Sequence, residues 1–94
     1  MDRESKILYE AALLGEDATE FLESPLGKEI KREALEEIDE AQEEFIDADP
    51  EDAKKMRELQ ARIREPQKAI GWLIKRIIRG KEALQQLEEM KYEP

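Results

Sequence analysis

Positions along the second half of this chain recur at alternating intervals of three and four residues without a break. They are Met56, Leu59, Ile63, Pro66, Ile70, Leu73, Ile77, Gly80, Leu84 and Leu87. Such spacing keeps one stripe of a long α-helix facing a partner helix. The chain has few aromatic residues, and 44% of its residues are charged, a composition typical of long amphipathic helices. We therefore predict an all-α fold, either an antiparallel helical hairpin or a three-helix bundle.

Two prolines mark where helices begin. Ser24 precedes Pro25 and Asp49 precedes Pro50, so each pair places a capping side chain before a proline in the first helical turn. The connection that ends at Pro50 is short, and a short connection makes neighbouring helices antiparallel. We predict one small helical domain over residues 1–94. Its helices are expected at about residues 4–23, 25–46 and 50–90.

Glycine and proline disturb the predicted helices. Gly15 interrupts the first one, and Asp17 with Glu20 resembles a capping box that restarts a helix, so this segment is predicted as one broken helix or two short ones. Pro66 costs about 3 kcal/mol in a helix interior. Because no capping residue precedes it, we predict that the long C-terminal helix is kinked at Pro66 and not broken. Gly80 lies in the stripe, which indicates a neighbour packed closely against bare backbone.

Beyond Pro66 the apolar stripe widens into a face too broad for one partner helix. Its members are Ile70, Leu73, Ile74, Ile77 and Ile78, with Trp72 at the border. The sequence allows two ways of covering this face. The first two helices could close over this face within the chain, or a second molecule could cover it, because a monomer rarely leaves such a surface exposed. We take this face as the candidate interaction surface.

Charge is polarised along the chain. Residues 1–53 carry 19 acidic and 5 basic side chains, whereas residues 54–94 carry 6 acidic and 11 basic ones. In an antiparallel hairpin the acidic second helix lies beside the basic third helix, so the simplest interpretation is mutual neutralisation that also fixes the register.

A basic face with one aromatic residue lies on the third helix, where Lys68, Trp72, Arg76 and Arg79 recur at helical spacing. Cations beside an aromatic ring suit a phosphate or a stacked base. Four residues on a chain of net charge −9 form a poor footprint for nucleic acid, so we expect no such partner. The alternative is that Trp72 packs beneath the N-terminal helix while the cations meet its carboxylates.

Regular carboxylates on the second helix, Glu36, Glu40 and Glu43 among them, form an acidic face. Such an array can imitate phosphates and steer a nucleic-acid-binding protein toward it. A solvated helix face is the commoner explanation of the same pattern.

Chemistry-bearing residues are sparse. The chain has no cysteine and no histidine, and it shows no nucleophile with a base and no glycine-rich phosphate loop. Asp47, Asp49, Glu51 and Glu58 have the spacing of a calcium loop, but Asp52 stands where that loop needs glycine. We therefore expect no enzyme, no catalytic residue, no cofactor and no metal. No segment has the length or apolarity of a membrane span.

Four segments carry a family resemblance: Phe21-Leu-Glu-Ser-Pro-Leu-Gly-Lys, Asp49-Pro-Glu-Asp, Arg57-Glu-Leu-Gln and Pro66-Gln-Lys-Ala-Ile-Gly-Trp-Leu. From about residue 10 to 90 the chain resembles a group of short, acidic, all-helical proteins of tailed bacteriophages and prophages, often encoded near head and portal genes. The resemblance implies an accessory role in virion assembly, with self-association or a larger virion protein as partner and no catalytic residue to transfer. It implies a location in the cytoplasm of a bacterial host or in the virion assembled there.

Overall fold

The computed structural model describes residues 2–92, and within them the chain forms three α-helices and no strand. The helices are α1 (Arg3–Glu23), α2 (Pro25–Asp47) and α3 (Ala53–Tyr92). The all-α prediction is therefore confirmed, and the first two helices have nearly the predicted bounds.

A sharp corner joins α1 to α2, and Ser24 builds it. The Ser24 hydroxyl donates to the carbonyl of Phe21 at 2.5 Å and accepts the Gly27 N–H at 3.0 Å, so it ends one helix and caps the next. A Cβ on Gly27 would lie 1.7 Å from the Phe21 carbonyl oxygen. The corner therefore needs glycine at this position, and the predicted cap at Ser24 with Pro25 in the first turn is confirmed.

The predicted start of the third helix at Pro50 is wrong, because Asp49 begins a turn instead of a helix. The Asp49 carbonyl accepts the Asp52 N–H at 3.0 Å, which closes a four-residue turn with Pro50 in its second position. Proline favours that position because its φ angle already fits. The capping role passes to Asp52, whose carboxylate accepts the Lys55 N–H at 3.1 Å, and α3 begins at Ala53.

Helix α1 is continuous, so the predicted interruption at Gly15 is wrong, as is a restart at Asp17. At its N-terminus the Asp2 carboxylate accepts the Ser5 N–H at 2.7 Å. This hydrogen bond to the charged form lowers the pKa of Asp2. A glycine inside a helix costs about 1 kcal/mol relative to alanine, and close packing against a neighbouring helix can offset this cost.

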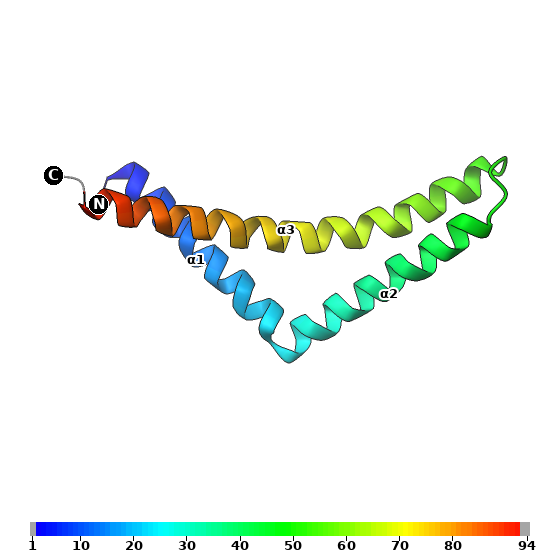
Figure 1. The fold of residues 1–94 in the computed structure, drawn as a ribbon, viewed down its shortest axis with the longest axis horizontal. Helices are drawn as coiled ribbons and strands as arrows, with labels where there is room; N and C mark the ends of the chain where they lie inside the picture. The colour runs from blue at the N-terminus through cyan, green and yellow to red at the C-terminus, as the bar shows by residue number, and fades with distance from the viewer. Residues whose placement is uncertain (1, 93–94) are drawn as a thin grey trace.

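Helix α3 runs through Pro66 without a break over 40 residues. Figure 1 shows it bowed in its middle portion, as expected where a proline removes one backbone hydrogen bond and crowds the preceding turn. The long helix can therefore meet two partners that lie at different angles.

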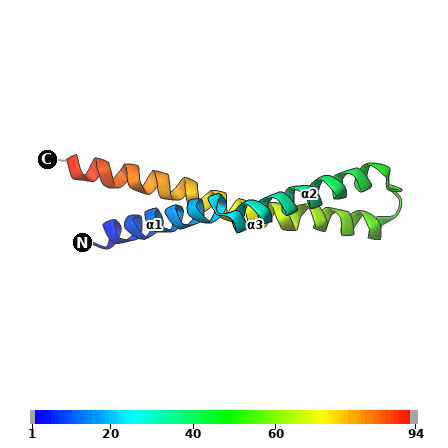
Figure 2. The ribbon, with the colours of Figure 1, turned by 90° about the horizontal axis from the view of Figure 1, so that it is seen from below.

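The three helices form an open, elongated arrangement of 64 × 29 × 16 Å. In Figure 1, α1 and α2 make a V whose corner points away from α3, and α3 spans the opening. Helix α2 runs antiparallel to the first part of α3, and α1 runs antiparallel to the second part. Figure 2 shows α1 and the end of α3 splaying apart toward the two termini. The chain thus combines the predicted hairpin with a third helix that covers only part of α3.

The buried core is small and consists mostly of alanine. Among residues 2–91 its apolar members are Ala12, Ala18, Ile38, Ala41, Leu59 and Ala83, and Leu59 is the one large side chain there that is fully buried. Late in α3 the packed face leaves the predicted stripe, because Ala83 is only 3% exposed whereas Leu84 is 49% exposed. A straight α-helix drifts relative to a seven-residue repeat, which accounts for this rotation.

Candidate interaction surface

The predicted wide face of α3 is only partly covered. Ile70, Leu73 and Ile77 are half-buried, whereas Ile74 and Ile78 are 45% and 51% exposed. We call Ile70, Ile74, Ile77 and Ile78 the α3 strip. Of the two predicted covers, the one within the chain reaches one edge of this face. The outer edge stays open to solvent in the single chain.

Glycines explain why the cover is partial. A Cβ on Gly15 would lie 2.8 Å from the Gly80 Cα, and one on Gly80 would lie 2.8 Å from the Gly15 Cα. The two backbones therefore touch, as predicted for Gly80, and Ala12 and Ala83 are buried beside them. A contact made by backbone and small side chains buries little area. Larger apolar residues of α1, including Leu14, remain exposed.

A groove runs between α1 and α3 beside this contact. Gly15 and Ala12 line it from α1, and Ile77 and Leu84 line it from α3. The Thr19 hydroxyl, also in the lining, donates to the Gly15 carbonyl at 3.0 Å within α1. The charged residues at the groove are Glu16, Glu20 and Lys81. An apolar groove continuous with the α3 strip suits an apolar protein surface.

Trp72 points out into solvent at 68% exposure, so the alternative that it packs beneath α1 is wrong. The residues around it on α3 form an open hollow lined by Arg64, Gln67, Lys68, Gly71, Trp72 and Lys75. The structure thus brings Lys68 and Trp72 together. Arg76 and Arg79 are exposed on the same helix and are not among the residues that line this hollow.

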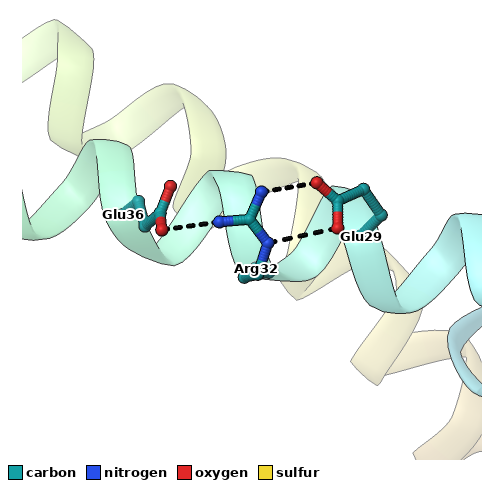
Figure 3. A network of polar contacts seen from close by, with 3 residues as sticks. All are labelled: Glu29, Arg32 and Glu36. Carbon is teal, nitrogen blue, oxygen red and sulfur yellow. Dashed lines mark hydrogen bonds and ion pairs between the residues drawn. The ribbon is translucent and has the colours of Figure 1, made fainter.

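The predicted acidic face of α2 divides into two parts. Glu36 accepts a hydrogen bond from Arg32 at 2.6 Å, and Glu29 accepts two more from the same guanidinium (Figure 3). These bonds lower the pKa of Glu29 and raise the pKa of Arg32. By contrast, Glu40 and Glu43 line an open hollow at the hairpin end together with Glu44, Asp47, Ala48, Asp49 and Lys55.

One cation joins the two helices of the hairpin. The Arg62 guanidinium of α3 donates to Glu37 at 2.8 Å and also pairs with Glu44, and both glutamates belong to α2. Both hydrogen bonds raise the pKa of Arg62, Glu37 more than Glu44. Between residues 2 and 92 no other ion pair joins two helices, so the direct charge pairing across the hairpin is made by this arginine.

Neither a metal-binding cluster nor a membrane-spanning helix is found among residues 2–92. In the part of the chain that the structure describes, no group of three or more acidic side chains is placed to hold a metal ion. The Asp49 carboxylate accepts the Glu51 N–H at 2.9 Å, so part of the calcium-like spacing serves the turn. None of the described helices is both long enough and apolar enough to cross a bilayer.

Two contacts between helices are not evident from the sequence, the one at Gly15 and the one at Arg62. In the sequence Gly15 indicates a helix interruption, although its place among Ala11, Ala12 and Ala18 also resembles a close-packing stripe. The sequence does not single out Arg62 as the residue that pairs with α2, because many basic residues of α3 offer equivalent ion pairs.

No protein-family model matches the chain, and no curated protein or solved structure matches it either.

Proposed function

We propose that this protein is a non-enzymatic protein-binding module, an accessory protein of bacteriophage virion or head assembly. It acts through helical self-association or by docking on a larger virion protein. The observation that supports binding is the α3 strip, in which Ile74 and Ile78 are about half exposed beside an apolar groove. A surface of this kind on a chain with so small a core marks a place where another protein binds. The resemblance to short phage proteins supports the assembly setting.

The test is whether the strip is a contact surface or ordinary core. Ile74→Asp and Ile78→Asp together place two carboxylates on the strip. We expect the double variant to keep its far-UV circular dichroism spectrum and to lose association, measured by size exclusion with light scattering and by binding to candidate virion proteins. Gln86→Asp puts the same group at an exposed position of α3 and serves as the control. Unfolding of the double variant alone would show that the strip is core.

A second candidate is an acidic, phosphate-mimicking inhibitor of a host nucleic-acid-binding protein. The observation that favours it is the hollow at the hairpin end, which gathers Glu40 and Glu43 with three more acidic side chains and one lysine. Its test is displacement of duplex DNA from a basic DNA-binding protein. Replacing Glu36, Glu40 and Glu43 by glutamine abolishes the displacement under this hypothesis, and leaves association through the strip unchanged under the first.

A further inference from the structure

The single chain exposes far more surface than a compact protein of its size. Its accessible surface is 7615 Å² at a mass of 11.0 kDa. A folded monomer of that mass exposes about 5,600 Å². The excess, about 2,000 Å², is more than twice the roughly 800 Å² that each partner contributes to a standard protein interface. The radius of gyration agrees, since it is 19.0 Å where a compact domain of this length has about 12 Å.

The uncovered surface has an apolar middle between two charged margins. The groove residues Ile77 and Leu84 lie on the side of α3 that faces α1. Successive residues of an α-helix are turned by about 100°. Ile74 and Ile78 therefore follow next around the helix, and Lys75 and Lys68 follow beyond them. We call this surface, from the groove across the α3 strip to those lysines, the open face.

The two margins of the open face differ in charge. On the outer side of α3, Arg64, Lys68 and Lys75 form a basic margin, and no acidic side chain lines the hollow there. On the other side lies α1, which carries six acidic and two basic residues and places Glu16 and Glu20 at the groove beside Lys81 of α3. No ion pair within residues 2–92 joins these two margins. Each margin therefore retains its charge for a partner.

We propose that the open face binds a second copy of this chain in a two-fold dimer whose α3 helices run parallel. When the two-fold axis runs along α3, the basic margin of each copy lies against the acidic margin of the other. An axis across α3 makes the helices antiparallel and sets like charges against each other, which costs free energy. The dimer rests on the proposed binding function of the strip, and it adds the partner and the orientation.

Spin labels can measure the orientation directly, because the chain has no cysteine of its own. Gln60→Cys and Gln85→Cys are separate variants at exposed positions of α3, one on each side of the strip. In a parallel dimer each label lies about 10 to 25 Å from the same label in the other molecule, because packed helices are about 8 to 10 Å apart. The two sites are about 37 Å apart along the helix. In any antiparallel dimer, the distance between the two copies of the same label must therefore exceed about 35 Å for at least one of the two sites.

The expected result is a dimer in light scattering and a short distance at both sites by pulsed electron paramagnetic resonance. Adding Ile74→Asp to either labelled variant should remove the short distance, which ties the pairing to the open face. A long distance at one site or both would overturn the parallel dimer. A monomeric chain would overturn it too. The proposed binding of the strip to a different protein is tested separately by the stability of the Ile74→Asp, Ile78→Asp variant, which stays folded if the strip is a contact surface.

Discussion

The hairpin of α2 with α3 and the contact of α1 with α3 use the same long helix in different ways. In the hairpin, one large side chain, Leu59, is fully buried, and Arg62 bridges two glutamates of the opposite helix. At the other contact the backbones meet at Gly15 and Gly80, with alanines around them. The hairpin is stabilised by packed and paired side chains, whereas the contact of α1 with α3 depends on two glycines, whose lack of a side chain lets the backbones touch.

This difference affects what each region leaves exposed. In the hairpin, Ile38 of α2 and Leu59 of α3 are buried, so larger side chains fill part of the space between these two helices. Close backbone contact between α1 and α3 leaves the branched residues on either side without a partner. The α3 strip lies along that second contact. The contact that packs through small residues is therefore the one with an apolar groove beside it.

The largest expected effect is on the hairpin. Leu59→Ala removes its fully buried side chain, and a buried leucine replaced by alanine costs about 2 to 5 kcal/mol of unfolding free energy. In a domain this small, that loss is a large part of the total stability. Urea denaturation followed by circular dichroism measures it.

Leu84→Ala is the matched control in the same helix, because Leu84 is about half exposed. It should cost about 1 kcal/mol, in proportion to the smaller apolar area removed from contact. Equal costs for the two leucines would contradict the distinction between a side-chain-packed hairpin and a backbone-packed contact.

Gly80→Ala against Gly71→Ala tests the second contact, with a smaller expected effect. Alanine favours a helix over glycine by about 1 kcal/mol when nothing else changes. A Cβ at Gly71 has no atom within 4 Å, so this variant should be more stable. A Cβ at Gly80 would meet Gly15 Cα at 2.8 Å and the Ala11 carbonyl oxygen at 3.2 Å, so α1 must move away and the melting temperature should fall.

If Gly80→Ala raised the melting temperature as Gly71→Ala does, the glycine contact would have no structural importance. A thermal melt of each, at one protein concentration, separates the two outcomes. The concentration must be equal because association also stabilises a folded chain.

Local signals in the sequence predict the start of α2 but not the start of α3. Ser24 before Pro25 placed the start of α2 correctly, since capping depends on a few neighbouring atoms. The same pattern at Asp49 failed, because a proline in the second position of a turn satisfies the same preference. Pattern alone could not distinguish these two local structures, and the hydrogen bonds of Asp49 and Asp52 do.

The candidate surface depended on information that is not local. The sequence identified the wide apolar face and the special position of Gly80. It did not show that Gly15 is the residue that meets Gly80, because the pairing joins segments 65 residues apart. For the same reason it could not show that Trp72 is exposed, since the position of α1 across α3 decides which edge of the face is covered.

The smallest expected effect concerns Arg62, whose ion pairs belong to the hairpin and have no counterpart at the glycine contact. Arg62→Gln should lower the melting temperature slightly, and Glu37→Gln added to it should lower it less than Glu37→Gln does alone, because the two groups act as one pair. The effect should shrink at high salt, where exposed charges are screened. Arg32→Gln is the control, since its ion pairs lie within α2. Strict additivity of Arg62→Gln and Glu37→Gln would mean that the ion pair of these two residues adds nothing to the stability of the hairpin.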